Sequence, residues 1–457
     1  MYPNDAVYKL LCTKINYMKQ IISLLLFSLS SCLAVVAQRK QQVFFTDVNN
    51  FWVAYDSIRS TTDSLKQIQY IKKLYIDKGT PGLRAFMEVR AYTPQEWVSS
   101  IRQHPRFWDS IRPNTWRAKA AVRQIEPALK KLKKLYPALR PASIYFTIGA
   151  LRSGGTVKDS LVLIGTELAI GTATTDVSEF SKNKSAFLTR HYKSEPSQNI
   201  VPLNIHEYVH TQEKASGSTL LGQALNEGVC DFVTECVTGK TMPLPYMTYG
   251  PKHEQELKEK FKAQLFSPYY GNWFYNQESD DPNHVPDLGY YMGYAICKTY
   301  YQQAKNKQQA IKELIELDFA NSDATEAFLT KTHYYVEPIN KAQLLQAYES
   351  NRPVVSSITP AIPSDGYLDA NVKEIRVEFS RPMGPSRSLD LGPDAGGKTP
   401  VVGSTPFSAD KKSFAYKVNL KPGQTYDLIL MGFMEDGGFR SLDGYPLKPY
   451  RLTFKTK

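Results

Sequence analysis

Cysteine is scarce in this sequence: five occur among 457 residues. Two of them, Cys12 and Cys32, lie in an N-terminal segment that we expect to be removed, which leaves Cys230, Cys236 and Cys297. An odd set of three cannot form a disulfide framework, so we expect these side chains to be small apolar groups of the core. The sequence also lacks an uninterrupted apolar run of about 20 residues, the length that a membrane-spanning helix needs.

The apolar run nearest to that length, Ile21–Val36, is interrupted by serines and follows the short basic start Met18-Lys19. Together with the small residues Val35-Val36-Ala37 before Gln38, it is typical of a signal peptide over residues 1–37, with Met18 as the true start. Leu29-Ser30-Ser31-Cys32 also resembles a bacterial lipoprotein box, in which Cys32 would carry the lipid. Either alternative predicts an extracytoplasmic protein that is periplasmic, secreted or held at the cell surface.

Acidic residues are fewer than basic ones: 44 Asp and Glu against 56 Lys and Arg give a formal net charge of +12. The basic residues are spread along the chain, and acids lie between them. The densest run, Lys130–Lys134, has leucines at helical spacing and indicates the solvated face of a helix. No nucleic-acid-binding motif accompanies the charge, so we expect no nucleic-acid partner.

Two regions of different periodicity predict a multidomain α+β protein. Residues 38–350 are mainly helical by their apolar spacing. Two β-branched or aromatic runs in this region, Ile144–Ile148 and Leu161–Ile164, predict a small hairpin or sheet edge around a glycine-rich segment. After residue 352 the pattern alternates in strand fashion between turn signals such as Asp443-Gly444. We expect residues 353–457 to form a separate β-sandwich.

His206-Glu207-Tyr208-Val209-His210 is an H-E-x-x-H motif in a helix-compatible stretch. Four helical residues advance about 400°, so both imidazoles leave one face about one turn apart and can share one metal ion, for which zinc is well suited. Glu207 is the next position round the helix, where its carboxylate can act as general base on a metal-bound water. In a chain of this composition the motif arises by chance only about 0.01 times.

The extension that marks metzincins, a glycine and a third histidine within six residues of the second histidine, is absent, because Thr211–Ser216 follow His210. That class is excluded. Glu227 instead follows after 16 intervening residues, beyond the Ser216-Gly217-Ser218 break that can turn the chain back. We expect Glu227 to reach the metal from a second helix.

Three further acids lie near these residues in the sequence. Asp231 follows Glu227 by four residues on the same helix face, where it can accept the second N–H of a ligating histidine and fix its tautomer. Glu213 and Glu235 are competing third ligands. Glu213, however, shares a helix with both histidines and would have difficulty closing a tetrahedron.

His206-Glu207-x-x-His210 followed by Asn226-Glu227-x-x-x-Asp231 resembles the gluzincin metallopeptidases, and the second helix is similar to that of thermolysin-like enzymes. The resemblance spans about 30 residues, Asn204–Glu235. It implies a mainly helical, zincin-like catalytic domain with a small β-sheet and one zinc ion. It also implies His206, His210 and Glu227 as zinc ligands and Glu207 as base. Asp231 would accept the second N–H of a ligating histidine. The spacer between His210 and Glu227 is a few residues shorter than in thermolysin-like enzymes.

The aminopeptidase motif Gly-Ala-Met-Glu-Asn is absent, although Glu167 can supply an acidic group near a substrate amine; its alternative is a surface acid. Catalysis also needs a group that stabilises the oxyanion. The aromatic and glycine-containing segment Asp287–Tyr294 offers Tyr291 and Tyr294, with His284 as the next choice. The alternative for each of these side chains is a role in packing.

The tail resembles the bacterial Ig-like domains of cell-surface proteins through Ile358-Thr359-Pro360, Val377–Met383 and Leu452-Thr453-Phe454. We therefore predict an exported zinc metallopeptidase that acts on peptides or proteins, with a tail that contacts a cell surface or a polysaccharide. One alternative is a non-catalytic surface or adhesion protein with a structural metal site. The other is a zinc hydrolase of a non-peptide amide.

Overall fold

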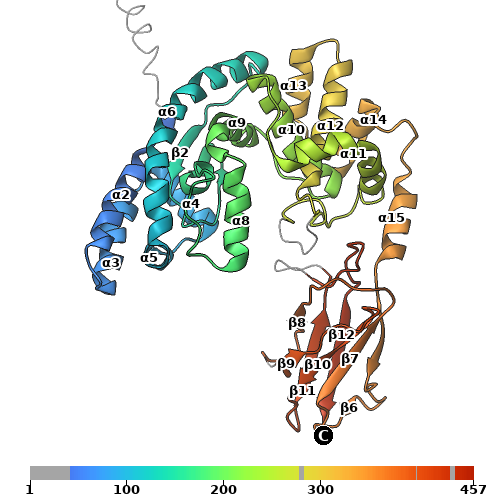
Figure 1. The fold of residues 1–457 in the computed structure, drawn as a ribbon. Coiled ribbons are helices and arrows are strands. Elements are labelled where there is room, and N and C mark those ends of the chain that lie inside the picture. Colours follow the sequence, from blue (N-terminus) through green and yellow to red (C-terminus); the bar gives the residue numbers. More distant parts are fainter. Residues whose placement is uncertain (1–41, 277–282, 398, 433–437) are drawn as a thin grey trace, which may run out of the picture.

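The computed structural model describes residues 42–276, 283–397, 399–432 and 438–457 (Figure 1). The predicted signal peptide, with Cys12 and Cys32, lies outside these residues. The coarse expectation of a protein built from both helices and strands is confirmed, with 47% of the residues helical. In the described part, no helix is long and apolar enough to cross a membrane.

A first group of helices packs around a small sheet and contributes much of the larger hydrophobic core. Several of these helices begin with proline, which lacks an N–H and is tolerated where that N–H would have no intrahelical partner. The helices are α2 (Thr46–Arg59), α3 (Ser64–Ile71), the π-helix η1 (Lys72–Ile76), α4 (Pro81–Arg90), α5 (Pro94–Gln103) and α6 (Pro105–Leu135).

The small sheet has the strand order β1-β2-β4-β3. The two predicted runs become β2 and β4 and pair in parallel, so they do not form a hairpin with each other, but the predicted sheet edge is present. The glycine-rich segment between them forms the edge strand β3 and makes an antiparallel hairpin with β4, which turns at Asp159 with φ +52°. The strands are β1 (Val43–Phe44), β2 (Ser143–Thr147), β3 (Gly155–Lys158) and β4 (Leu161–Gly165).

The middle of the chain is organised around the buried helix α10, which packs against α9 and α12. At the crossing with α12, a Cβ added to Gly228 would lie 2.1 Å from the carbonyl carbon of Gly293, so the two backbones are in direct contact. The elements are α7 (Thr166–Ala169), α8 (Lys182–Lys193), the 3-10 helix η2 (Pro196–Asn199), α9 (Ile200–His210), α10 (Leu220–Thr238), α11 (Pro245–Lys262) and α12 (Leu288–Gln303).

Three shorter helices lead to the strands: α13 (Lys307–Ile315), α14 (Ser322–Thr332) and α15 (Lys341–Asn351). Two four-stranded sheets follow, with the orders β5-β7-β10-β9 and β6-β12-β11-β8. Their strands are β5 (Val355–Thr359), β6 (Tyr367–Leu368), β7 (Glu374–Phe379), β8 (Leu389–Leu391), β9 (Val401–Ser404), β10 (Ser413–Val418), β11 (Thr425–Leu430) and β12 (Tyr450–Thr456).

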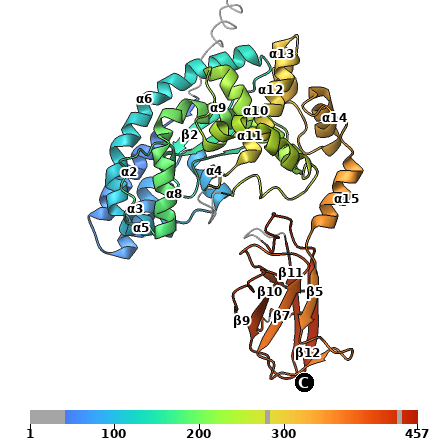
Figure 2. The same ribbon diagram turned by 45° about the vertical axis from the view of Figure 1, so that its right-hand side comes forward.

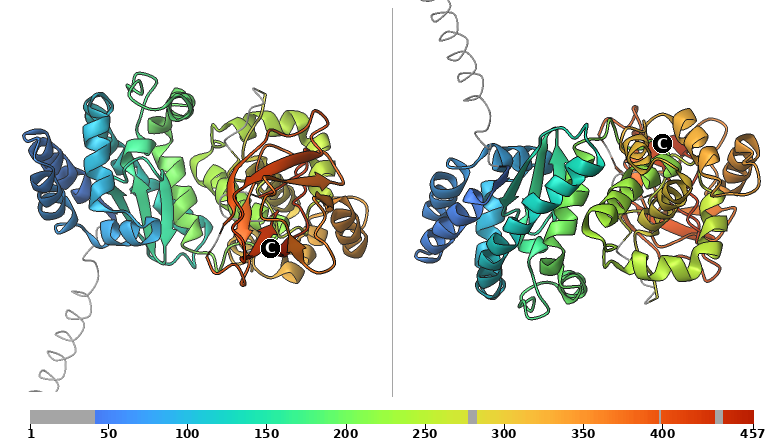
Figure 3. Two further views of the ribbon diagram at one scale, coloured as in Figure 1. Left: turned by 90° about the horizontal axis from the view of Figure 1, so that it is seen from below. Right: turned by 90° about the horizontal axis from the view of Figure 1, so that it is seen from above.

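These two sheets, called here the β region, share one hydrophobic cluster that is separate from the larger core of the helices. In β7 every second side chain is buried, namely those of Ile375, Val377 and Phe379, because successive residues of a strand point to opposite faces. The β region lies below α11–α15 and away from α2–α5 (Figures 1 and 2). The views from below and above show the same arrangement (Figure 3).

Candidate metal centre

A tight reversal of the chain joins the two helices that carry the predicted ligands. Helix α9 ends at His210, and α10 begins after Thr219, whose Oγ1 accepts a hydrogen bond from Gly222 N at 3.1 Å and caps the helix. Gly217 lies between the two helices, where an added Cβ would clash with the backbone nitrogen of Gln223. The small residues of this turn therefore let α10 return beside α9.

The imidazoles of His206 and His210 and the carboxylate of Glu227 converge on one point. The two Nε2 atoms are 3.2 Å apart, and Glu227 Oε2 lies 3.2 Å from His210 Nε2 and 3.4 Å from His206 Nε2. His206 and Glu227 are each only 7% exposed. The structure thus brings the three residues predicted as ligands together from two helices.

A carboxylate lies behind each imidazole ring. His206 Nδ1 is 2.9 Å from Asp231 Oδ1, and His210 Nδ1 is 2.7 Å from Glu213 Oε2. The hydroxyl of Tyr246 donates to Asp231 Oδ2 at 3.0 Å and holds that carboxylate in place. Because an ionised carboxylate can only accept, each Nδ1 carries a hydrogen, and in the neutral ring, the form that can bind a metal, each Nε2 presents its lone pair.

Three acceptor atoms therefore face one another at this point. Two lone pairs and a carboxylate oxygen at such distances repel one another unless a cation lies among them. Burial lowers the pKa of His206, but hydrogen bonds from its ring to the Asp231 and Glu227 carboxylates outweigh it and raise that pKa to about 10. Burial opposes ionisation of Glu227, yet His210 and His206 hold its pKa well below the usual range. The arrangement favours positive charge among these three side chains.

Glu207 leaves α9 toward the edge strand β3. A Cβ added to Gly155 would lie 2.7 Å from Glu207 Oε1, so the strand backbone passes directly by this carboxylate. Burial raises the pKa of Glu207, while His206 and His210 oppose that shift. The predicted base is thus a half-buried carboxylate between the two histidines predicted as ligands and an edge strand.

Two tyrosines at this centre were not predicted from the sequence. Tyr275 Oη lies 3.4 Å from Glu227 Oε1 and 3.3 Å from Gln223 Nε2. The ring of Tyr290 lies 6.3 Å from that of His206, with an angle of 29° between their planes. The only sequence signal for Tyr275 is an aromatic cluster, residues 273–275, in a loop without periodicity.

The structure places Tyr291 and Tyr294 elsewhere. Tyr291 Oη donates to Glu254 Oε2 at 2.7 Å, and Tyr294 Oη donates to Glu235 Oε2. Glu235 follows Glu227 by eight residues on α10, which is about 12 Å along the helix axis. This distance separates Tyr294 and Glu235 from the centre, while Tyr291 is bonded to Glu254 on α11. Neither expected oxyanion tyrosine therefore lies at the three converging atoms, and nor does Glu235.

Three other side chains named in the sequence also have defined places. His284 Nε2 is 2.7 Å from Asn276 O and pairs with the backbone there. Glu167 is fully buried, contrary to the expectation of a surface acid, and accepts hydrogen bonds from Gly149 N and Leu151 N at 2.9–3.1 Å. Burial raises the pKa of Glu167 to about 7. This carboxylate is therefore committed to the loop between β2 and β3.

Cys230 provides a second possible ligand set, because it could hold an ion together with His206 and His210. Its Sγ atom lies 3.3 Å from His210 Nδ1 and 3.3 Å from Glu213 Oε1. Cys230 and Glu213 therefore lie on the Nδ1 side of the His210 ring, whereas Glu227 lies on the Nε2 side. Only Glu227 shares the side on which both Nε2 atoms converge.

Comparisons with known proteins leave this chain without an assigned family. No family model matches it, and no curated protein matches it. Two solved structures match, the S-layer protein rSbsC(31-844) and domains 1-6 of the surface layer protein SbsC. Each is 14% identical and covers 61% of this chain, which spans 37% of either structure, with TM-scores of 0.16 and 0.17. Similarity at this level carries no argument about fold or function.

Proposed function

We propose that this protein is an exported zinc-dependent peptidase whose metal is held by His206, His210 and Glu227. The observation that carries the proposal is the convergence of two imidazole lone pairs and a carboxylate oxygen while carboxylates occupy both Nδ1 atoms. Two nitrogens and one oxygen are a donor set of catalytic zinc sites, which keep a fourth position for water or substrate. The donor set and the carboxylates behind it therefore fit zinc.

When bound, zinc would polarise the scissile carbonyl and lower the pKa of the attacking water. Asp231 and Glu213 keep both histidines in the tautomer that presents Nε2. Glu207 takes the proton of the attacking water and passes it to the leaving amine. Burial raises the pKa of Glu207, and a base whose pKa lies nearer to neutrality returns its proton more readily.

Tyr275 takes the role that the sequence assigned to Tyr291 and Tyr294. Its hydroxyl lies beside the ligating carboxylate of Glu227 and can turn to donate a hydrogen bond to the oxyanion. Burial of its hydroxyl end beside Glu227 raises the pKa of Tyr275 well above its ordinary value, although much of the rest of the residue is exposed, so the hydroxyl keeps the proton that this role requires.

The edge strand β3 supports a peptide substrate. It pairs with β4 on one side and is the last strand of its sheet, so its other edge can receive an extended chain. Gly155, at the start of β3, lies against Glu207. A peptide paired along β3 would therefore pass the base, which is a geometry that favours cleavage of a backbone amide.

The proposal extends to the two parts of the chain. We propose a zincin-like catalytic domain over residues 38–350 and an Ig-like domain over residues 353–457 that contacts a cell surface or a polysaccharide. The two hydrophobic clusters support a division into two domains, and the two sheets around one core support a sandwich.

Zinc content per chain tests the ligand set. We expect the protein expressed from Gln38 to bind one zinc ion and to lose it, or bind it far more weakly, in His210→Ala and Glu227→Ala. His253→Ala is the matched control, because that ring stacks on Tyr249 at 3.7 Å, on α11 and outside the converging set. Retention of zinc in both ligand variants would refute the site.

Activity is tested on a peptide library with Glu207→Gln as the inactive variant. We expect this change to keep the zinc and abolish cleavage, since it removes only the base. If the unaltered protein binds zinc but cleaves no peptide, it is not a peptidase. Two alternatives then remain: a zinc hydrolase of a non-peptide amide and a non-catalytic protein with a structural metal site. A panel of non-peptide amides then separates a hydrolase of another substrate from a binding protein with a structural metal.

A further inference from the structure

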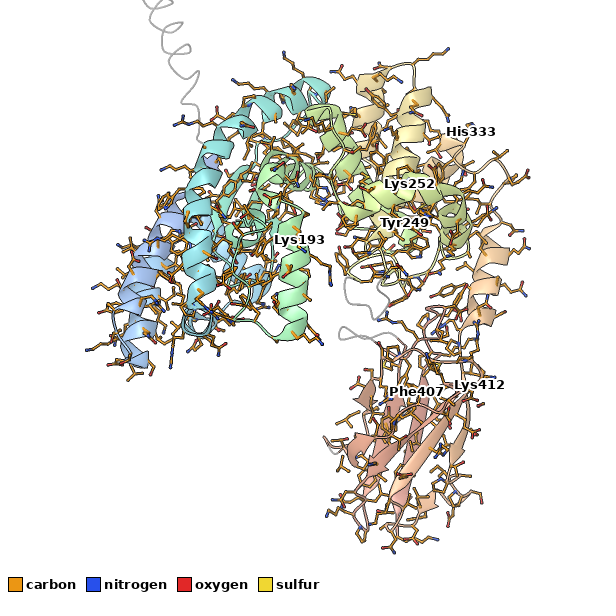
Figure 4. All side chains as sticks on the ribbon, viewed as in Figure 1. Lys193, Tyr249, Lys252, His333, Phe407 and Lys412 are labelled. Atoms are coloured by element: carbon orange, nitrogen blue, oxygen red, sulfur yellow. The ribbon has the colours of Figure 1, made fainter. Side chains whose placement is uncertain are left out.

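The β region contacts the segment that leads to Tyr275 at the candidate metal centre. Its loop 440–447 includes Gly444, whose carbonyl accepts a hydrogen bond from Asn272 Nδ2 at 3.0 Å. The two residues are 172 positions apart in the sequence. Figure 4 labels Phe407 and Lys412 at the end of the β region that faces the helices. The contact shows that loop 440–447 reaches the helical part directly.

Loop 440–447 is also fastened to the end of α15. Arg352 donates from Nε to Pro446 O and from Nη2 to Leu447 O, each at 3.1 Å. The rings of Tyr348 and Tyr445 pack with their centroids 5.3 Å apart. These contacts fasten the loop to the end of α15, from which it supports Asn272.

The approach between loop 440–447 and Asn272 is close. Gly444 has φ +86°, and an added Cβ would lie 2.5 Å from Asn272 Nδ2. Any larger residue at position 444 must therefore displace the Asn272 side chain. This contact can be broken from the β region without changing a residue near the metal.

Hydrogen bonds connect Asn272 to Tyr275. The backbone carbonyl of Asn272 accepts a hydrogen bond from Asn276 Nδ2 at 2.7 Å, and Asn276 Oδ1 accepts one from Asp287 N at 2.9 Å. Asp287 Oδ1 in turn accepts from Tyr275 N at 2.7 Å. This set of bonds ties Asn272 to Tyr275 and Asp287.

The conformation held by these bonds is an unfavourable one. Tyr275 and Asp287 have φ +57° and +61°, a region that residues other than glycine seldom adopt. The Tyr275 side chain is 61% exposed, so packing contributes little to its placement. The surrounding hydrogen bonds therefore hold Tyr275 where its hydroxyl meets Glu227.

We propose that loop 440–447 positions Tyr275 at the metal centre through Asn272, which makes the β region a structural part of that centre. The expectation that the tail contacts a cell surface or a polysaccharide did not include this role. The inference rests on the proposed function for the contribution of Tyr275 to hydrolysis. The positioning itself is independent of any substrate.

The test compares two full-length variants, Gly444→Ala and Gly366→Ala. Gly366 lies in the β region with φ +75° and open space around it, so its variant has the same backbone penalty without touching Asn272. Hydrogen–deuterium exchange is measured at the amides of Tyr275 and Asp287. We expect exchange to be about three- to tenfold faster in Gly444→Ala only, the effect of weakening about one hydrogen bond.

Zinc content should stay at the parent value in both variants, because the ligands lie on α9 and α10. Peptide cleavage should fall in Gly444→Ala, the variant with faster exchange. If the unaltered protein has no peptidase activity, the proposed function is refuted, but the exchange result still tests the positioning of Tyr275. Equal exchange in the two glycine variants would overturn the proposal. Faster exchange in the sheets of the β region as well would mean that Gly444→Ala disturbs more than the contact with Asn272. Arg352→Met, which removes the hydrogen bonds that hold loop 440–447, then decides the question. Faster exchange at the Tyr275 amide in this variant supports the proposal, and unchanged exchange overturns it.

Discussion

Adding one methyl group at Gly228 tests whether the crossing of α10 and α12 sets the geometry of the metal centre. The new Cβ would lie 2.1 Å from the Gly293 carbonyl carbon, whereas ordinary contact begins at 3.4 Å. The backbones must therefore separate by 3.4 − 2.1 = 1.3 Å, because neither contact atom belongs to a flexible side chain. Overpacking of this kind costs about 2–3 kcal/mol in the free energy of unfolding.

The same shift should weaken metal binding. Glu227 precedes Gly228 on α10, and ligand distances in a metal site tolerate changes of only about 0.2 Å. A displacement of 1.3 Å would remove the Glu227 carboxylate from the two Nε2 atoms. We therefore expect Gly228→Ala to lose both stability and zinc affinity.

Two assays and one control decide this prediction. Urea unfolding of the metal-free protein gives the free energy of unfolding, and competition with a chromophoric chelator gives the zinc affinity. The control is Gly239→Ala at the end of the same helix, where φ is +77° and no atom lies within 4 Å of the added Cβ. It should cost about 1 kcal/mol and leave zinc affinity unchanged. Equal behaviour of the two variants would refute the argument.

Three further predictions follow from the contacts of the centre and its surroundings. Asp231→Asn removes the charge behind His206 and should weaken zinc binding about 10- to 100-fold in chelator competition; an unchanged affinity would contradict the role of this carboxylate. Tyr275→Phe should lower kcat about 100-fold with zinc retained, and similar losses in Tyr291→Phe and Tyr294→Phe would contradict our assignment. Burial raises the pKa of Glu167 to about 7 from 4.5, so the folded protein binds this proton more tightly and stability falls as pH rises between these values. Glu167→Gln should flatten that fall in urea unfolding at pH 5 and pH 7.5, whereas an unchanged slope would contradict it.

The convergence of His206, His210 and Glu227 could be predicted from the sequence because it depends on local helix geometry. Residues four apart on a helix share a face, so the histidine pair and the pair of Glu227 and Asp231 follow from helical spacing alone. The reversal at Gly217 needs only small residues. Every distance that brings His206, His210 and Glu227 together arises within one short stretch of chain.

The tyrosines could not be predicted because they depend on how α12 is rotated. Each helical residue turns the side chain by about 100°, and the buried residues of α12 do not form a single apolar stripe. The sequence therefore does not distinguish Tyr290, which faces His206, from Tyr291 and Tyr294. The position of Tyr275 is even less predictable, because a loop residue with positive φ belongs to no periodic pattern that would show where its side chain points.

The small sheet and Glu167 show two other limits. Strand β3 reads Gly-Thr-Val-Lys, which lacks the apolar alternation of a half-buried strand, so its sequence alone predicts a link between the two neighbouring strands. Glu167 is buried although it is acidic, because backbone N–H groups of Gly149 and Leu151 satisfy its carboxylate. Such compensation is a tertiary contact and has no signature in the local sequence.

The contact between Asn272 and Gly444 implies an order of events during folding. His210 and Glu227 are 17 positions apart, whereas Asn272 and Gly444 are 172 apart. The entropy of closing a chain loop grows with (3/2)RT ln n, so the longer closure costs about 2 kcal/mol more. The nascent chain can therefore bring His206, His210 and Glu227 together before residues 353–457 are made, while Tyr275 is held in place only after those residues have folded. Refolding in which zinc capture and locking of Tyr275 occur together would contradict that order. Under the proposed function, a newly made molecule would bind zinc first and gain peptidase activity only after residues 353–457 have folded.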